Sequence, residues 1–344
     1  MPENFDLLVF IGRFQPVHSS HLSIMQAALH RARRLLVLVG STNVTRSTKN
    51  PFSFAERSVM IRASMGELES RVQVCPIKDY PYMEDLWVKG VQDAVQTAAL
   101  ELGAQSIGLI GHEKDESSYY LRMFPQWPLV ESPNIDGRSA TELRDLILAP
   151  NGRGSHLVLE SAMPSACVEF VEEFRRLPQY QRLVNEHAFL KSYHRQFASY
   201  PYPPVFVTVD AVVIHSGHIL LVERKAEPGK GLLALPGGFI DQRERIADGM
   251  LRELKEETNI KIPLPVLRGS IKSSRVFDDP DRSQRGRTIT HAFHIEFPGG
   301  ELPRIKGGDD AAKAVWLPLS DFYALDGAMY EDHWHIAAGF IGLT

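Results

Sequence analysis

The sequence of 344 residues lacks the features of a disulfide-stabilised, membrane-spanning or broadly basic protein. Its two cysteines, Cys75 and Cys167, lie far apart, which excludes a disulfide framework and a cysteine-rich zinc site. Lysine and arginine number 38 against 42 aspartates and glutamates, so the net charge of -4 creates no broad basic surface for nucleic acid. The first apolar run, Leu7 to Ile11, is too short to cross a bilayer, and acids precede it where a secretion signal carries bases.

The remaining composition is that of an ordinary globular protein, and the length indicates two domains. Hydrophobic residues make up 44% and charged residues 23% of the chain, and a domain of average size has about 150 residues. Together with the absences above, this predicts a cytoplasmic protein that binds neither nucleic acid nor membrane. The sequence leaves a homo-oligomer open.

The two halves of the chain differ in their hydrophobic pattern. In the first half, short apolar runs alternate with stretches of helical spacing, as in a doubly wound α/β domain with a parallel sheet. The predicted strands there are 7–11, 35–39, 72–75 and 106–110, and the predicted helices are 18–34, 54–66 and 85–102. After a helical stretch at 164–195, the second half has predicted strands at 205–214, 219–223 and 288–297 around a helix at 244–258, which indicates an α+β domain.

A proline-rich segment separates the halves. Tyr200 to Pro204 contains three prolines, which cannot continue a helix. We expect a first domain over residues 1–185, a linker over 186–204 and a second domain over 205–344.

The end of the first predicted strand has the composition of a phosphate-binding loop. Gly12 permits a tight turn, and the helix that follows exposes unpaired backbone N–H groups to an anion. His18 and His21 are three residues apart, so both imidazoles face one side of the first helical turn and can contact phosphate oxygens. The alternative is a histidine pair at a helix start without a function. A zinc site is not indicated, since no third ligand is recognisable by its spacing.

Ser139, Thr141 and Arg144 open another predicted helix and are a second candidate for this site. Serine and threonine are ordinary N-caps at such a position. A hydroxyl beside an arginine can equally hold a pyrophosphate.

These two motifs resemble the signatures of the nucleotidylyltransferase superfamily, and most closely those of nicotinamide mononucleotide (NMN) adenylyltransferases of the archaeal type. The resemblance covers roughly the first 185 residues. Further matching residues are Lys49–Phe52, Glu56–Arg57, Asp79–Tyr80, Trp87 and Gly111–Tyr120. The chain departs from the family pattern at Ser20, where a glycine is usual.

The resemblance implies adenylyl transfer to NMN with ATP as co-substrate. It implies that His18, His21 and Arg144 are catalytic residues: the histidines contact the ATP phosphates, and Arg144 steadies the pyrophosphate. The implied nucleotide-binding residues are Gly12, Arg13, Phe14, Lys49, Asn50, Ser139 and Thr141. Trp87 is the expected stacking surface for the cationic nicotinamide ring, although a tryptophan there can equally belong to the core.

Three glutamates in the second half are spaced to share one helical face. Glu253, Glu256 and Glu257 stand at i, i+3 and i+4, where like charges repel one another unless a cation lies between them. Carboxylate oxygens are the ligands that Mg²⁺ prefers, so the spacing indicates a magnesium site. A solvated acidic helix face is the alternative, and the Gly-Gly turn, Glu244 and Arg252 that precede the glutamates favour the metal site.

The segment 238–260 resembles the Nudix box. The residues in register with it are Gly238, Glu244, Arg252, Glu253, Leu254, Glu256, Glu257 and Ile260. Asn259 stands where the box has its last glycine. Asparagine is the next best residue for the left-handed conformation that a helix end often requires, so we expect this substitution to be tolerated.

The resemblance to the Nudix box implies a hydrolase with a divalent cation, Mg²⁺ or alternatively Mn²⁺. The implied metal ligands are Glu253, Glu256 and Glu257, of which Glu253 and Glu257 are the implied catalytic residues. A further acid is expected from a distant loop; we favour Asp310, with Asp309 as its rival.

An arginine cluster that includes Arg282, Arg285 and Arg287 is similar to the equivalent segment of ADP-ribose pyrophosphatases, which implies that these residues bind nucleotide.

The two halves together resemble one bifunctional family, an NMN adenylyltransferase fused to a Nudix ADP-ribose pyrophosphatase. The resemblance implies an enzyme of NAD metabolism whose partners are small nucleotides: ATP, NMN, NAD and ADP-ribose. Two alternatives remain: a different phosphate acceptor in the first domain, such as a pantetheine or flavin precursor, and a second domain that senses ADP-ribose without cleaving it.

Overall fold

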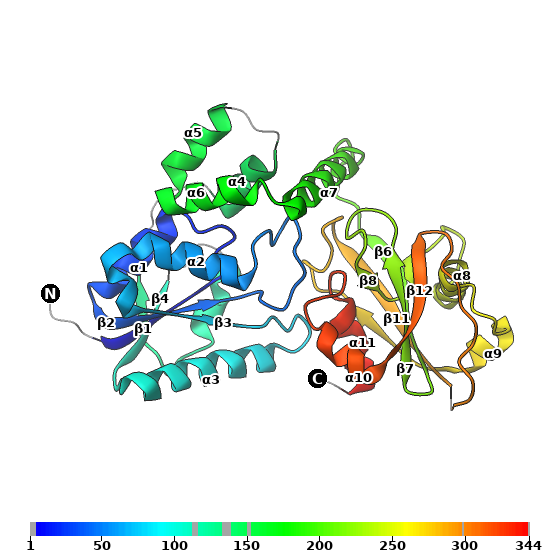
Figure 1. Cartoon of the computed structure of the whole chain (residues 1–344). Coiled ribbons are helices and arrows are strands. Elements are labelled where there is room, and N and C mark those ends of the chain that lie inside the picture. Colours follow the sequence, from blue (N-terminus) through cyan, green and yellow to red (C-terminus); the bar gives the residue numbers. More distant parts are fainter. Residues whose placement is uncertain (1–4, 112–115, 133–138, 150–152, 298, 343–344) are drawn as a thin grey trace. The chain divides into compact units, whose positions relative to one another are not determined.

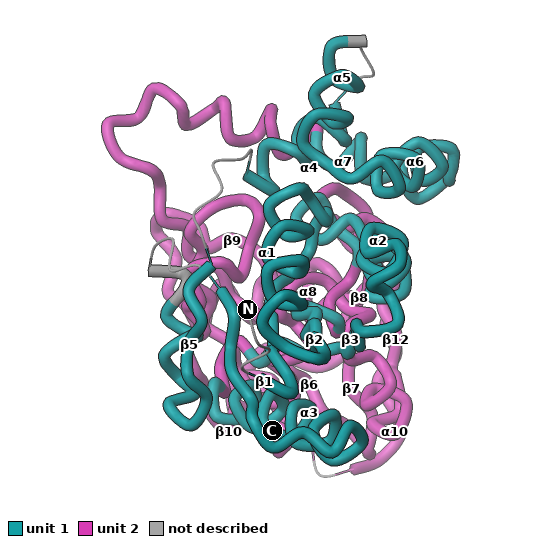
Figure 2. Tube along the Cα trace, turned by 90° about the vertical axis from the view of Figure 1, so that its left-hand side faces the viewer, with its two compact units in different colours: residues 1–42, 46–80, 84–187 teal, residues 43–45, 81–83, 188–344 magenta. Residues whose placement is uncertain are grey.

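The computed structural model describes residues 5–111, 116–132, 139–149, 153–297 and 299–342. They form two compact units, which Figure 2 distinguishes by colour. Unit 1 comprises residues 1–42, 46–80 and 84–187, and unit 2 comprises residues 43–45, 81–83 and 188–344. The division falls inside helix α7 (Pro178–Arg195), so residues 186–195 of the expected linker are helical. Within the described ranges, no helix is both long enough and apolar enough to cross a membrane.

Five parallel strands form the sheet of unit 1, in the order β3-β2-β1-β4-β5; Figure 1 shows β1 to β4. They are β1 (Phe5–Gly12), β2 (Ala32–Val39), β3 (Val72–Pro76), β4 (Ile107–Gly111) and β5 (Leu129–Glu131). Successive residues of β1 face opposite sides of the sheet, so Leu8 and Phe10 belong to one core cluster and Leu7 and Val9 to the other. This burial on both faces explains why the strand is a continuous apolar run. The strand order reverses between β1 and β4, and ligands of such sheets bind at the carboxyl ends of the strands at this point.

Helices cover both faces of this sheet. α1 (Ser19–Leu29) and α2 (Phe54–Met65) pack on one core cluster, and α3 (Glu84–Leu102) packs on the other. The remaining helical elements of unit 1 are η1 (Gly66–Arg71), η2 (Glu116–Arg122), α4 (Ala140–Leu148), α5 (Arg153–Ala162) and α6 (Ser165–Phe174). The predicted doubly wound α/β fold is therefore confirmed. One boundary was wrong: residues 32–34 belong to β2 and not to the first helix, because Ala32 and Arg34 pair with β1.

Unit 2 is built on a mixed sheet in the order β10-β11-β6-β7-β12, with β8 beside β7 and β9 beside β6. Its strands are β6 (Phe206–His215), β7 (His218–Arg224), β8 (Leu233–Ala234), β9 (Gly237–Phe239), β10 (Ile271–Phe277), β11 (Thr288–Phe297) and β12 (Ala311–Pro318). Its helical elements are α8 (Ile246–Thr258), α9 (Leu264–Gly269), α10 (Leu319–Phe322), η3 (Tyr323–Leu325) and α11 (His333–Ile341). α8 packs on one face and α10 and α11 on the other, which confirms the predicted α+β class.

The sequence did not indicate the strands at the two edges of this sheet, β10 and β12. Most side chains of β10 are exposed, so the strand lacks the apolar pattern by which strands are recognised. It forms because its backbone pairs with β11 from Ile271 to Phe277, which is a tertiary interaction.

Two glycines of unit 1 make a matched test of the packing. A Cβ atom at Gly90, inside α3, would meet no atom within 4 Å, whereas one at Gly108, in β4, would lie 2.8 Å from the Phe5 ring and 3.1 Å from the Pro128 carbonyl oxygen. We expect Gly90→Ala to raise the free energy of unfolding by about 0.5–1 kcal/mol, since alanine costs less backbone entropy in a helix. We expect Gly108→Ala to lower it by about 1–3 kcal/mol through overpacking. Thermal unfolding of both variants checks this, and equal melting temperatures would contradict it.

Candidate active sites

The loop between β1 and α1 is folded tightly around Phe14. This residue has a φ of 52° and is 1% exposed, and its ring lies 3.1 Å from the position that a Cβ atom at Gly12 would occupy. A side chain at Gly12 would therefore displace the ring. The loop leads directly into the N-terminus of α1, where backbone N–H groups and the helix dipole favour an anion.

His18 and His21 lie together at this helix start. Their ring centroids are 3.7 Å apart, and the backbone N–H of His18 donates to Nδ1 of His21 at 3.3 Å. Burial holds the pKa of His21 well below its ordinary value, and the neighbouring His18 lowers it further. His21 is therefore neutral near pH 7. Since its Nδ1 accepts a hydrogen bond, its proton lies on Nε2, which can donate to a phosphate oxygen.

Gln15 joins this loop to the segment that carries Lys49 and Asn50. Its side-chain amide donates to the Phe52 carbonyl at 2.7 Å and accepts from the Phe52 N–H at 3.0 Å. Two segments far apart in the sequence are thus fixed side by side. The Oδ1 atom of Asn50 is buried and accepts no hydrogen bond from the part of the chain that the structure describes. A buried acceptor of this kind calls for a partner, which a bound nucleotide can supply.

The predicted serine–threonine–arginine motif meets the same loop. Ser139 caps α4, where its hydroxyl accepts from the Glu142 N–H at 3.3 Å. Arg144 donates to the Gln15 carbonyl at 2.8 Å and to the Thr141 hydroxyl at 2.9 Å. Burial lowers the pKa of Arg144 to about 10, and the positive charge of Arg13 lowers it further. Two guanidinium groups that repel each other at a helix start are suited to a polyanion.

Trp87 lies at the start of α3, on the opposite face of the sheet from α1. It is partly buried and packs against Tyr120 and Phe124, with centroid distances of 6.2 Å and 5.9 Å. Core packing is thus part of its role, and a stacking role for its remaining surface stays a prediction. The matching residues His112, Lys114 and Asp115 lie outside the described residues.

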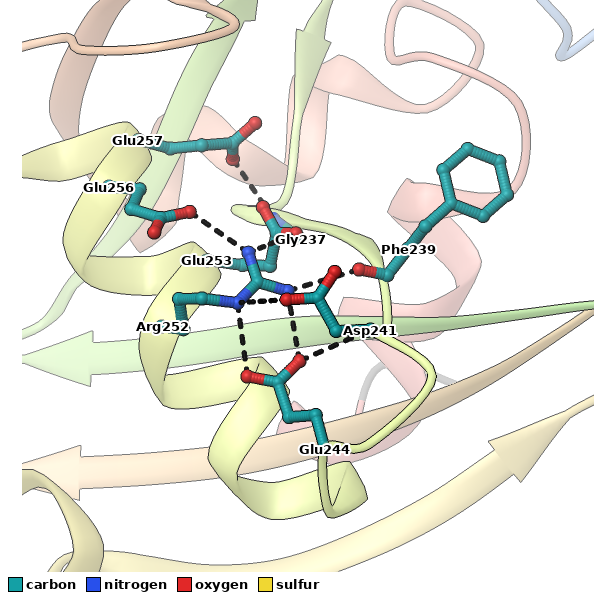
Figure 3. Close-up of polar contacts among 8 residues, drawn as sticks. All are labelled: Gly237, Phe239, Asp241, Glu244, Arg252, Glu253, Glu256 and Glu257. Carbon is teal, nitrogen blue, oxygen red and sulfur yellow. Dashed lines mark hydrogen bonds and ion pairs between the residues drawn. The ribbon is translucent and has the colours of Figure 1, made fainter.

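In unit 2, Arg252 joins the acidic residues of the α8 segment (Figure 3). Its Nε and Nη2 atoms each donate to the Glu244 carboxylate at 3.0 Å. Its Nη1 atom donates to Glu253 at 2.8 Å and to Glu256 at 2.9 Å. The hydrogen bonds from Arg252 to Glu244 hold the pKa of Glu244 below its ordinary value. Arg252 therefore orients the glutamates that the spacing had indicated.

Two glycines let the backbone approach these carboxylates. The Gly237 N–H donates to Glu257 at 3.0 Å, and a Cβ atom at Gly237 would lie 2.1 Å from the Val209 carbonyl oxygen. A Cβ atom at Gly238 would lie 2.7 Å from the Glu253 carboxylate. Only glycine fits at either position without displacing its neighbours.

The glutamates have the chemistry of a divalent-cation site. Burial raises the pKa of Glu253, and burial raises that of Glu257 to about 8, with the Glu253 charge adding to the rise. Carboxylates that resist ionisation in this way gain from a nearby cation. In the described part of the chain, no three His, Cys, Asp or Glu side chains lie close enough together to hold a metal ion, and Glu253 and Glu256 are paired with Arg252. The carboxylate donor set fits Mg²⁺ or Mn²⁺.

The loop before β12 is fastened to the C-terminal end of α8. The Lys306 N–H donates to the Thr258 carbonyl at 2.9 Å, and the Gly308 N–H donates to the Glu257 carbonyl at 3.1 Å. Asn259 has a φ of 46°, which confirms that the residue in the glycine position of the motif is left-handed. The loop places Asp309 close enough to Glu253 for its charge to raise the Glu253 pKa. Which of Asp309 and Asp310 supplies the further acid stays a prediction.

The three predicted arginines have different environments. Arg282 is 7% exposed and forms a bidentate ion pair with Asp332, at 2.8 Å and 2.9 Å, so its guanidinium belongs to the interior and its role in nucleotide binding stays a prediction. The Arg285 guanidinium lies 4.7 Å from the centre of the Phe239 ring, and Phe239 directly follows the Gly-Gly turn. Arg287 donates to the Asp278 carbonyl. This buried pair could not be predicted from the sequence, because Asp332 is 50 residues away from Arg282.

The comparison with known proteins divides the chain in the same way. Residues 9–145 match the cytidylyltransferase-like family and residues 204–340 match the NUDIX domain family. The chain is 38% identical over 185 residues to a nicotinamide/nicotinic acid mononucleotide adenylyltransferase of Acinetobacter baylyi, covering 53% of this chain and 94% of that protein. It is 37% identical over 127 residues to an ADP-ribose pyrophosphatase of Methanocaldococcus jannaschii, covering 37% of this chain and 69% of that protein.

One solved structure matches nearly the whole chain. It is a bifunctional NMN adenylyltransferase/ADP ribose pyrophosphatase from Francisella tularensis, complexed with AMP and a manganese ion. The TM-score is 0.91 and the sequence identity 37%, and the match covers 98% of this chain and 99% of that one.

The raised pKa of Glu257 predicts how cation binding depends on pH. A carboxyl group must lose its proton to bind a cation, so affinity for Mg²⁺ should rise by up to about tenfold per pH unit until the pH reaches the pKa, and then level off. With a pKa of about 8, we expect the rise to continue to that pH. Calorimetric titration with MgCl₂ at a series of pH values below and above the Glu257 pKa checks the expectation. Glu257→Gln should flatten the profile, and a pH-independent affinity in the unmodified protein would contradict it.

Proposed function

Because the chain belongs to the family of bifunctional NMN adenylyltransferase/ADP-ribose pyrophosphatases, we propose that it catalyses both reactions. Unit 1 transfers the adenylyl group of ATP to NMN, giving NAD and pyrophosphate. Unit 2 hydrolyses ADP-ribose to AMP and ribose 5-phosphate. The observation that carries this proposal is the similarity over 98% of the chain to the Francisella protein, whose name combines both activities. A different acceptor or an ADP-ribose sensor is not favoured.

In unit 1, the reaction needs positioning and electrostatic stabilisation and no protein nucleophile. A phosphate oxygen of NMN forms a bond to the α-phosphorus of ATP while the bond from that phosphorus to the pyrophosphate oxygen breaks. We propose that His18, His21 and the N–H groups of α1 donate to the ATP phosphates, where charge develops. Arg13 and Arg144 stabilise the departing pyrophosphate. Lys49 and Asn50 contact the nucleotide from the neighbouring segment that Gln15 holds in place.

In unit 2, we propose that Glu253, Glu256 and Glu257 hold Mg²⁺ or Mn²⁺; the Francisella structure contains manganese. Such a cation, when bound, neutralises the diphosphate and activates water. Arg252 keeps the carboxylates on one face of α8. Asp309 is our candidate for the general base, the carboxylate that accepts a proton from the attacking water. We also propose that Arg285, whose guanidinium lies over the ring of Phe239 next to the Gly-Gly turn, contacts the substrate.

Single substitutions test whether the two sites are independent. We expect His18→Ala to lower kcat for NAD formation by about 10²–10³-fold, because one donor to the developing charge is lost. ADP-ribose hydrolysis by the same sample should be unchanged. Glu257→Gln should abolish hydrolysis and leave NAD formation intact. Both activities are measured with ATP plus NMN and with ADP-ribose plus MgCl₂. Loss of both activities in either variant would contradict the two-site proposal.

The neighbouring aspartates of the β12 loop test the assignment of the acid. We expect Asp309→Asn to lower kcat for ADP-ribose hydrolysis by about 10²-fold or more, as for loss of a general base. Asp310→Asn is the matched control, since it makes the same change one residue along the chain. If Asp310→Asn has the larger effect, the sequence-based choice of Asp310 is right and the proposal for Asp309 is wrong.

A further inference from the structure

Arg57 is a charged residue in the interior of unit 1; it matches the family pattern, but the proposed reaction assigns it no role. It lies on α2 and is 1% exposed, which makes it one of the largest fully buried side chains of the protein. A buried guanidinium is costly unless its N–H groups are hydrogen-bonded. The hydrogen-bond partners of Arg57 therefore show which parts of the fold its guanidinium stabilises.

All of its hydrogen-bond partners found in the described residues are backbone carbonyls. Its Nη1 atom donates to Arg13 at 2.6 Å and to Gly40 at 2.7 Å, and its Nη2 atom donates to Ser41 at 3.1 Å. Its Nε atom donates to Ser53, the N-cap of its own helix, at 3.3 Å. One guanidinium thus ties α2 to the segments that follow β1 and β2.

The peptide between Gly40 and Ser41 is held from both sides. Its carbonyl accepts from Arg57, and its N–H donates to the Asp79 carboxylate at 3.1 Å. A trans peptide directs these two groups in opposite directions, so it lies between the cation and the anion. The Ser41 hydroxyl donates to the same carboxylate at 2.5 Å. Asp79 follows β3, so the network joins the carboxyl ends of three neighbouring strands.

Ser41 also has an unfavourable backbone conformation. Its φ is 52°, in the left-handed region that residues other than glycine seldom adopt. Such a conformation persists only where the surroundings enforce it, and it is often found at functional sites. Here the bonds to Arg57 and Asp79 enforce it.

We propose that Arg57 is a positioning residue for the adenylyl-transfer site. It fixes the carbonyl of Arg13 and the Gly40–Ser41 peptide, and so sets the path of the loop that carries Arg13 and leads to His18. The planar guanidinium serves several acceptors at once, which a lysine ammonium cannot do in the same geometry. This proposal rests on the proposed function of unit 1.

Arg57→Lys and Arg57→Met test this role, with Arg62→Met as the matched control. Arg62 lies on the same helix, but its side chain is 42% exposed and pairs only loosely with Glu69 at 3.7 Å. For each variant, kcat and KM for ATP and NMN, hydrolysis of ADP-ribose and the thermal unfolding curve are measured. Rates are expressed per folded chain at the assay temperature.

We expect kcat/KM for NAD formation to fall by about tenfold or more in Arg57→Lys and further in Arg57→Met, because small displacements of reacting groups are costly. Hydrolysis of ADP-ribose should match that of the Arg62→Met control. If a variant begins to unfold, the assay is repeated at a lower temperature, where the chain is folded. A rate per folded chain equal to that of the control would overturn the proposal. Absence of NAD formation in the unmodified protein would instead overturn the proposed function.

Discussion

Each candidate site is organised by one arginine whose guanidinium hydrogen-bonds several groups at once, and Arg57 is fully buried whereas Arg252 is partly exposed. In unit 1, Arg57 gathers backbone carbonyls from the segments after β1 and β2. In unit 2, Arg252 gathers the carboxylates of Glu244, Glu253 and Glu256. The first arrangement shapes a loop, and the second orients side chains along one helix.

The two sites use opposite charges for similar ligands. Unit 1 presents imidazoles and guanidiniums at a helix N-terminus, which suits the phosphates of a nucleotide directly. Unit 2 presents carboxylates, which suit a diphosphate only through a divalent cation. The net charge of -4 therefore says little about the ligands, since the acidic and basic groups that matter lie in different units.

The sequence predicted most of the sheet of unit 1 and the box of unit 2, because both are local patterns. Strands buried on both faces are apolar runs, and the residues of the box lie on one loop and one helix. The edge strands β10 and β12 were missed, because their formation depends on pairing with distant strands. The ion pair of Arg282 with Asp332 was also missed, because nothing near Arg282 in the sequence indicates it.

The sequence by itself determined the class of each fold, the family of each half and the residue types that each reaction needs. These depend on periodicity and short spacing, which are properties of neighbouring residues. Only the tertiary structure decided that the charge of Asp309 acts on Glu253, and that Arg57 and Gln15 hold the loops of unit 1 together. The reason is physical: these contacts join residues that are adjacent only after the chain has folded, and burial then fixes their charges and hydrogen bonds.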